Sequence, residues 1–276
     1  MSAAYLSTLL FVSAATPARI QKALASDADT ICIDLEDSVP AGSKAAARIV
    51  ALEALSLSSR LSLRTNAVNT TAGLRDLLAL ADHANRPALL LIPKVESAAE
   101  IRIVANLLPG MPIVPLIETP AGLRETARIA AEVSVAAMMF GGGDMSAELG
   151  VELAWEPLLA ARGAFLLGCA EAARPAIDVP FIHLDDTAGL TQETRCAKAI
   201  GFQAKAAIHP AQIDIINTVL RPSDQEIADA REAIAAFEAA GGAAIRFKGR
   251  MLEEPVMRRF RRILAKSDHQ RSNNDA

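Results

Sequence analysis

The stretch Met138-Met139-Phe140-Gly141-Gly142-Gly143-Asp144 indicates the fold, because an apolar run stops abruptly at three glycines and a carboxylate. A second apolar run, at residues 113–117, stops in the same way at Glu118. Short runs of this kind are typical of buried parallel strands. In an α/β barrel the carboxyl ends of the strands carry the chemistry, so we expect Glu118 and Asp144 to converge on one rim from neighbouring strands. Two convergent carboxylates suit a divalent metal ion.

Strand-like and helix-like segments alternate on either side of this stretch, from residue 5 to about residue 220. The expected strands cover residues 9–13, 30–35, 61–63, 88–92, 113–117, 135–140, 176–182 and 204–208. The expected helices between them cover residues 17–26, 44–57, 74–83, 97–107, 123–131, 155–173 and 187–200. Eight such repeats leave no length for a second core, so the sequence predicts an α/β fold, a TIM (β/α)8 barrel, at residues 1–220.

The remaining residues, 221–276, are predicted to form a C-terminal helical extension. Ser223 and Glu226 are spaced as a capping box, and the helix that follows is expected to end near Gly241. From residue 243 onward the sequence contains nine Lys and Arg residues but only four Asp and Glu residues, which gives a local charge of +5. Two interpretations stay open: a solvated helix face with a frayed tail, or a basic lid or arm that meets an anionic substrate or a neighbouring subunit.

Composition excludes several classes of protein. A hydrophobic content of 51% with 4% aromatics predicts an aliphatic core, and the net charge of −4 argues against nucleic acid or a membrane surface as the partner. No apolar stretch reaches the roughly 18 residues that span a bilayer, and the N-terminus lacks the basic region of a signal peptide. The cysteines, Cys32, Cys169 and Cys196, show no paired spacing, so we expect reduced, buried thiols in a cytoplasmic protein.

Charged residues at other strand ends extend the candidate site. Arg64 follows the third strand, and its planar fork matches a carboxylate or a thioester carbonyl. Glu36 and Asp37 follow the second strand; they can pair with Arg64 or support the water ligands of a metal. Gly142 and Gly143 permit close backbone approach, so that a bound oxygen can receive main-chain N–H bonds.

Three further residues near strand ends keep two interpretations each. Lys94 and Lys205 can form structural ion pairs or act as catalytic amines. His209 can act as a base, or it can cap the helix that Pro210 begins.

Seven blocks together resemble the signatures of the citrate lyase beta-subunit family, part of the HpcH/HpaI aldolase superfamily that includes malyl-CoA, citramalyl-CoA and citryl-CoA lyases. They are LFV at 10–12, DLEDSV at 34–39, RTN at 64–66, PKVES at 93–97, IET at 117–119, FGGGD at 140–144 and IHPAQ at 208–212. The resemblance implies a TIM barrel that assembles as a homo-oligomer, a trimer or hexamer. It also implies Mg²⁺ held by Glu118 and Asp144, with Arg64 binding the carbonyl or carboxylate of the acid.

The resemblance further implies the chemistry. The pyruvate-aldolase branch carries a histidine after the glutamate of the second strand motif, whereas this chain has Glu36-Asp37, which favours the CoA-thioester branch. The implied reaction is magnesium-dependent cleavage or formation of a short 3-hydroxyacyl-CoA through a metal-bound α-keto acid and an acyl-CoA enolate. Glu36 and Asp37 are catalytic candidates, and we expect Arg19 and Lys22 to contact CoA phosphates.

Two positions depart from the family pattern. This chain reads Val12-Ser13-Ala14 where relatives commonly read Val-Pro-Gly, and Glu253 stands where relatives place an aspartate that can complete a neighbour's site as general acid/base. One extra methylene moves a carboxylate by roughly 1 Å, which can cost a large rate factor. Two other functions therefore stay open: a metal-dependent aldolase acting on a free hydroxy-keto acid without CoA, and a catalytically weak keto-acid-binding subunit of a larger complex.

Overall fold

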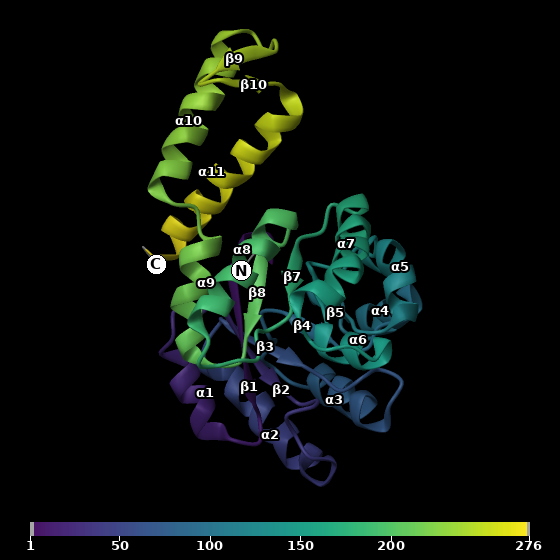
Figure 1. Ribbon diagram of the computed structural model, residues 1–276. Coiled ribbons are helices and arrows are strands. Elements are labelled where there is room, and N and C mark those ends of the chain that lie inside the picture. The colour runs from purple at the N-terminus through teal and green to yellow at the C-terminus, as the bar shows by residue number, and fades with distance from the viewer. Residues whose placement is uncertain (1–2, 275–276) are drawn as a thin grey trace. The chain divides into compact units, whose positions relative to one another are not determined.

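Eight parallel strands close into a barrel, with β8 pairing back onto β1 (Figure 1). The structure is a computed structural model that describes the backbone of residues 3–274 and the side chains of residues 3–269. The strands are β1 (Thr8–Ser13), β2 (Thr30–Asp34), β3 (Leu61–Arg64), β4 (Leu90–Ile92), β5 (Ile113–Ile117), β6 (Met138–Phe140), β7 (Ala176–Asp178) and β8 (Ala204–Ala207). The TIM barrel that the sequence predicts is confirmed.

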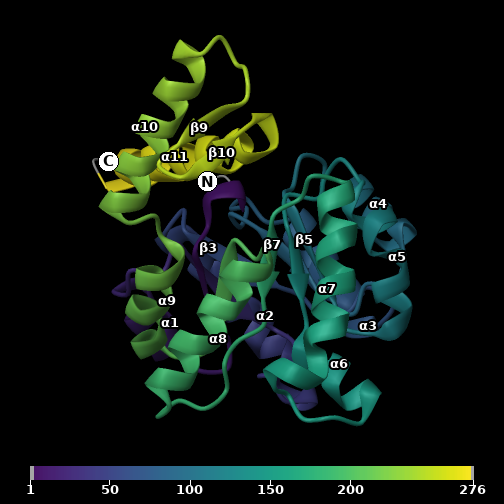
Figure 2. The same cartoon turned by 45° about the horizontal axis from the view of Figure 1, so that its top comes forward.

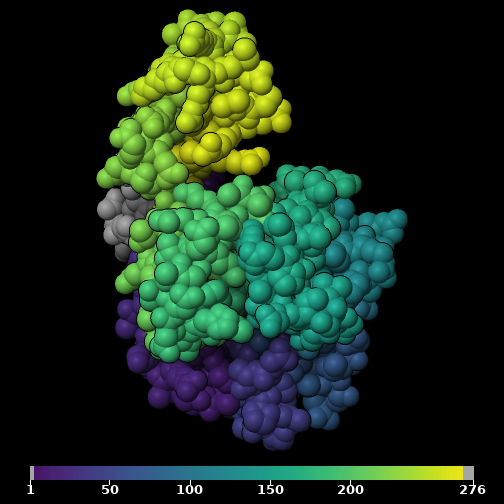
Figure 3. Space-filling model, in the orientation of Figure 1, coloured from purple at the N-terminus to yellow at the C-terminus, as the bar shows by residue number. Residues whose placement is uncertain are grey.

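Helices follow the strands around the outside of the barrel, and on the face shown in Figure 3 their side chains, coloured teal to green, form the surface. The α-helices are α1 (Pro17–Leu24), α2 (Lys44–Ala54), α3 (Thr71–Ala81), α4 (Ala98–Leu107), α5 (Pro120–Ala130), α6 (Gly142–Leu149), α7 (Trp155–Glu171), α8 (Thr187–Ile200) and α9 (Ile213–Leu220). Short 3₁₀ helices are η1 (Ala3–Tyr5), η2 (Ala41–Ser43), η3 (Leu55–Leu57) and η4 (Pro210–Gln212).

Most predicted elements differ from the observed ones by up to three residues at their ends, and two differences are larger. Helix α6 is not among the predicted helices, because it begins with Gly142 and Gly143, which are poor helix formers and hide its pattern. Strand β7 is predicted to run to residue 182 but ends at Asp178. Pro180, two residues further on, has no N–H to donate to a neighbouring strand.

The barrel interior is filled by alternate residues of the strands. The buried inner cluster draws on all strands but β3, through Leu9, Cys32, Leu89, Leu91, Val114, Leu116, Ala137, Met139, Ile177, Ala204 and Ala206. Because side chains alternate along a strand, the next inward positions after Leu116 and Met139 are Glu118 and Gly141. These two positions lie at the carboxyl end of the barrel, on adjacent strands whose register pairs Leu116 with Met139.

A buried ion network ties β7 to β8 and α7. Arg162 Nε lies 3.0 Å from Asp178 Oδ1, and Lys205 Nζ lies 2.7 Å from Asp178 Oδ2 and 2.7 Å from Glu193 Oε1. Burial opposes ionisation of Asp178, but Lys205 and Arg162 outweigh it and hold its pKa below the usual range. Lys205 is fully buried, so of its two interpretations the structure supports the structural ion pair.

The chain divides into two compact units, Met1–Thr218 and Val219–Ala276, and the division falls within α9. The second unit contains α10 (Asp224–Ala239), the hairpin of β9 (Ile245–Phe247) and β10 (Arg250–Leu252), and α11 (Glu254–Asn274). Helices α10 and α11 pack side by side around Ala233, Phe237, Leu252 and Met257 (Figure 2). The capping box is confirmed: Ser223 Oγ accepts the Glu226 N–H, and the Ser223 N–H donates to Glu226 Oε2.

All three cysteines are unpaired thiols, but Cys196 is partly exposed where the sequence led us to expect three buried ones. Cys196 lies on α8, whose outer face meets solvent. Within residues 3–274 no helix combines the length and hydropathy that a transmembrane span requires.

Asp178→Asn is expected to lower the free energy of unfolding by about 3–5 kcal/mol, because it leaves two buried cations without their shared anion. Urea denaturation followed by circular dichroism measures the change. Asp185→Asn, an exposed aspartate seven residues away, is the matched control and should change stability little. Equal effects of the two variants would contradict a stabilising role for the network.

Candidate active site

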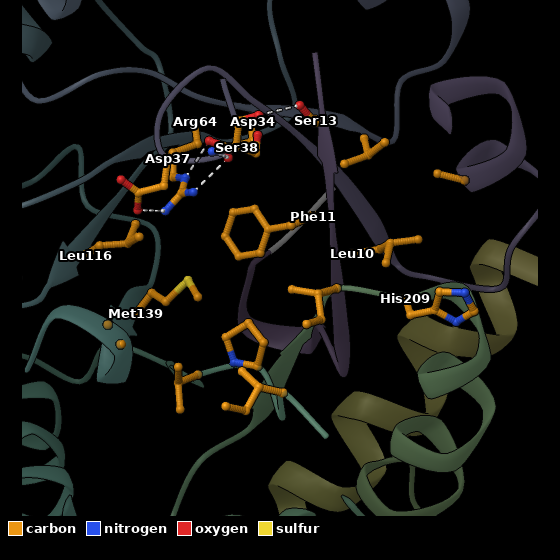
Figure 4. A pocket seen from close by; sticks show the side chains of 18 of the residues that line it. Leu10, Phe11, Ser13, Asp34, Asp37, Ser38, Arg64, Leu116, Met139 and His209 are labelled. Atoms are coloured by element: carbon orange, nitrogen blue, oxygen red, sulfur yellow. Dashed lines mark hydrogen bonds and ion pairs between the residues drawn. The ribbon is translucent and has the colours of Figure 1, made fainter. Parts of the chain in front are cut away.

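A pocket of about 840 Å³ opens at the carboxyl end of the barrel. Charged side chains form one wall, and Figure 4 shows Arg64, Asp34 and Asp37 gathered there, with His209 on the other side. Much of the remaining lining is apolar and includes Leu153, Val179, Pro180, Ile182, Leu184, Ile208 and Pro210. A mostly apolar cleft with a few convergent polar groups is typical of a small-molecule site.

Arg64 is held rigidly at the base of the charged wall. Its Nε and Nη2 donate to the two oxygens of Asp34 at 2.7 and 2.8 Å, and its guanidinium carbon lies 4.9 Å from the centre of the Phe11 ring. Burial opposes the charge, but Asp34 outweighs it and raises the pKa of Arg64, so the side chain stays cationic. Asp34 is a site residue that the sequence analysis missed; it is the last residue of β2 and lies opposite Arg64 in the strand register.

Glu36 and Asp37 occupy different positions beside Arg64. Glu36 is buried, with Oε2 2.9 Å from Arg64 Nη1 and Oε1 3.0 Å from Lys94 Nζ. Asp37 lines the pocket, and its oxygens lie 3.8 Å from Arg64 and 3.7 Å from Lys94. Burial raises the pKa of Glu36 although the charge of Arg64 opposes the rise. Asp37 is therefore the member of the pair that faces the cavity.

Glu118 follows β5 and turns its side chain across the end of β6. A Cβ atom on Gly141 would overlap Glu118 Cγ, so only glycine fits at that position. Glu118 Oε2 accepts the backbone N–H of Lys94 at 2.7 Å. Burial, and then the negative charge of Glu36, raise the pKa of Glu118 to about 8. The carboxylate thus sits in an environment that lacks a fully compensating positive charge.

Asp144 lies in the first turn of α6, four residues beyond the end of β6. The first intrahelical bond runs from the Met145 N–H to the Gly141 carbonyl, so the N–H groups of Gly142, Gly143 and Asp144 precede it. Gly143 lines the pocket, whereas Gly142 does not; a Cβ on Gly142 would lie 3.0 Å from Val179. A helix N-terminus of this kind favours an anion.

Lys94 forms ion pairs within this cluster. Its Nζ lies 3.0 Å from Glu36 Oε1 and 3.0 Å from Asp144 Oδ2. Burial opposes its charge, but hydrogen bonds to Glu36 and Asp144 outweigh burial and raise its pKa. A catalytic amine requires a lowered pKa, so the structure favours the ion-pair interpretation of Lys94.

The remaining candidates also line the pocket. His209 caps η4 by accepting the Ala211 N–H on Nδ1 at 3.2 Å, in line with the capping interpretation. Arg19 and Lys22 are exposed on α1 and line the pocket. Ser13 Oγ donates to the Ser38 carbonyl at 3.0 Å and so closes the turn in which this chain departs from the family pattern (Figure 4).

Glu253 belongs to the second unit. It lies between β10 and α11, its side chain is exposed, and its carbonyl accepts the N–H groups of Val256 and Met257. Its part in catalysis stays a prediction.

The donor set of the charged wall fits a hard divalent cation. Five carboxylates, those of Asp34, Glu36, Asp37, Glu118 and Asp144, contact one another or the two cations Arg64 and Lys94. Within the described residues, Glu118 Oε1 and Asp144 Oδ1 have no hydrogen-bond or ion-pair partner. No cluster of three His, Cys, Asp or Glu suited to a metal occurs in that part of the chain. Mg²⁺ suits two carboxylates, because water and substrate oxygens complete its octahedron.

Comparison with known proteins identifies the family to which the chain is similar. A family model described as HpcH/HpaI aldolase/citrate lyase matches residues 7–210, and one described as C–C bond lyase of the TIM-barrel fold matches residues 169–269. A (3S)-malyl-CoA thioesterase of Cereibacter sphaeroides is 35% identical, over 95% of this chain and 94% of the relative. An L-malyl-CoA/beta-methylmalyl-CoA lyase of that species is 32% identical, over 88% and 89%.

A solved structure supports the same placement. CitE of Mycobacterium tuberculosis, in complex with magnesium, acetoacetate and coenzyme A, is similar with a TM-score of 0.81 and 33% identity. The match covers 96% of this chain and 99% of that one. The family resemblance inferred from the seven sequence blocks is confirmed by these matches.

Glu118→Gln is expected to raise the Tm of the magnesium-free protein, and to raise it more at pH 8 than at pH 4.5. The pKa of Glu118 is about 8 in the folded chain and near 4.5 when unfolded, so its burial costs folding free energy increasingly between these values. Glutamine carries no charge, and its amide oxygen still accepts the Lys94 N–H.

Differential scanning calorimetry in EDTA measures the effect, with the exposed Glu152→Gln as control. A gain that is the same at both pH values would show that Glu118 is not held in an uncompensated site.

Proposed function

The chain belongs to the HpcH/HpaI aldolase/citrate lyase family, whose members include carbon–carbon lyases, and we propose that it cleaves or forms a short 3-hydroxyacyl-CoA with Mg²⁺. One observation carries the proposal: Glu118 and Asp144 line the pocket with the fixed guanidinium of Arg64, and among the described residues each has one carboxylate oxygen without a partner. The products of cleavage would be an α-keto acid and an acyl-CoA. Relatives that act on malyl-CoA and a neighbour solved with magnesium and coenzyme A support the assignment.

Glu118 and Asp144 would hold the metal ion. When bound, Mg²⁺ would supply positive charge that stabilises negative charge on the 3-oxygen when its proton is removed, the oxygen that becomes the keto-acid carbonyl. The raised pKa of Glu118 supports this role, because a divalent cation compensates the charge that burial and Glu36 make costly.

Arg64 would bind and orient the keto acid. Asp34 fixes the guanidinium from one side and Glu36 from another, so little side-chain freedom remains to be lost when the substrate binds. The planar fork donates to a carboxylate or carbonyl oxygen in the pocket, and the N–H of Gly143 at the start of α6 adds a second donor. Gly142 would contribute through the dipole of the same helix turn.

The acyl-CoA would occupy the outer pocket. Arg19 and Lys22 are exposed, lie one turn apart on α1 and line the pocket, so both can contact phosphates of CoA. Ile182, Leu184 and Ile208 provide an apolar wall for the acyl and pantetheine chain.

Two carboxylates would move protons. Cleavage removes a proton from the 3-hydroxyl group and adds one to the α-carbon of the acyl-CoA. Asp37 lines the pocket and can accept the hydroxyl proton, while Glu36 serves by holding Arg64 and Lys94. Glu253 is proposed as the general acid/base at the α-carbon, following the family pattern. We further propose a cytoplasmic homotrimer or hexamer.

Product analysis tests the function. The purified full chain with Mg²⁺ is expected to convert malyl-CoA or citramalyl-CoA into a keto acid and acetyl-CoA in equal amounts, measured by chromatography, without release of free CoA thiol. Asp144→Asn is expected to abolish this activity. Glu253→Gln should lower kcat by about 10²–10⁴-fold and leave keto-acid binding intact.

Other product patterns would contradict the lyase. Free thiol without keto acid would identify a thioesterase, and keto acid released from a free hydroxy-keto acid alone would identify an aldolase independent of CoA. Keto-acid binding with no turnover of any substrate would identify a binding subunit.

A further inference from the structure

We propose that Lys94 is the positioning residue of the metal site: it holds one oxygen of each ligand carboxylate and leaves the other oxygen facing the pocket. This inference rests on the proposed metal-binding roles of Glu118 and Asp144. Lys94 itself is not a ligand, because its ammonium is a hydrogen-bond donor.

Two different groups of Lys94 reach the two carboxylates. The backbone N–H donates to Glu118 Oε2 at 2.7 Å, and Nζ lies 3.0 Å from Asp144 Oδ2. The opposite oxygens, Glu118 Oε1 and Asp144 Oδ1, have no partner among the described residues. Outer contacts of this kind orient metal ligands and fix which oxygen is available.

The backbone of Lys94 supports a dedicated role. Its φ is +54°, one of three positive values at non-glycine residues in the described part of the chain. A lysine is not suited to this left-handed conformation, and such backbone persists where the surrounding structure requires it, often at functional sites. The conformation follows Pro93 at the end of β4 and lets the N–H and the side chain of one residue serve the same cluster.

Lys94 also connects the metal ligands to the substrate-binding arginine. Its Nζ lies 3.0 Å from Glu36 Oε1, and Glu36 Oε2 lies 2.9 Å from Arg64. Lys94, which follows β4, thereby connects carboxylates that follow three other strands, β2, β5 and β6. The spacing between the metal ligands and Arg64 therefore depends on Lys94.

A simpler role predicts the opposite effect on metal affinity. If Lys94 were only a counter-charge among carboxylates, its removal would leave a more negative site and tighten cation binding. If the Lys94 ammonium positions Asp144, its removal weakens binding despite the gain in negative charge, while the backbone N–H that holds Glu118 is retained. The sign of the change separates the two roles.

The experiment measures Mn²⁺ affinity of the full chain by EPR and Mg²⁺ affinity by calorimetry. Lys94→Met keeps the length of the side chain and its β-carbon but lacks the ammonium, and is expected to weaken binding by about 10–100-fold. Lys22→Met removes a cation from the same pocket without touching either carboxylate, so it should not weaken binding. Lys94→Gln retains a donor and should fall between Lys94→Met and the wild type.

Unchanged or tighter binding by a folded Lys94→Met, checked by circular dichroism, overturns the positioning role. If Lys94→Met does not fold, Lys94→Gln decides: weaker binding than wild type supports the role, and equal or tighter binding overturns it. A wild-type chain that binds no Mn²⁺, or binds it equally after Glu118→Gln, overturns the proposed metal site as well.

Discussion

The site depends on negative charge that the protein itself does not fully neutralise. Five carboxylates meet at one end of the barrel, and within the described residues Arg64 and Lys94 are the cations paired with them. The raised pKa of Glu118 reflects burial together with the charge of Glu36. Collecting like charges in a partly desolvated cleft costs free energy, and a divalent cation relieves that cost. In the proposed function, the metal ion and the substrate would therefore bind where the negative charge of the protein is least compensated.

Two features of the barrel make this arrangement possible: the register between β5 and β6, and the glycine at position 141. The pairing of Leu116 with Met139 brings Glu118 beside Gly141, and the absence of a Cβ there lets the Glu118 side chain cross the end of β6. Asp178 bridges Arg162 and Lys205 and ties β7 to β8. Rigid strands thus hold the polar groups, and the first turn of α6 adds Asp144 and free N–H groups.

Much of the fold follows from the sequence, because each apolar run ends in a recognisable break that carries a polar residue. The same pattern is sufficient to predict that Glu118, Asp144 and Arg64 share one rim. A role for Asp34 in the site could not be predicted. Asp34 lies within an apolar run that reads as strand, and its pairing with Arg64 depends on the register between β2 and β3. Lys94 was ambiguous, because its positive φ and its two contacts arise from tertiary structure. Glu253 keeps its assignment as a proposal, because it belongs to the second unit.

The metal site is tested most directly by anomalous diffraction from crystals of the wild-type chain soaked in Mn²⁺. The geometry predicts a single strong peak in the pocket, about 2.0–2.2 Å from one oxygen of Glu118 and one oxygen of Asp144, with the second oxygen of each still bonded to Lys94. A peak coordinated by other residues, or none in the pocket, would contradict the assignment of these two carboxylates as the metal ligands.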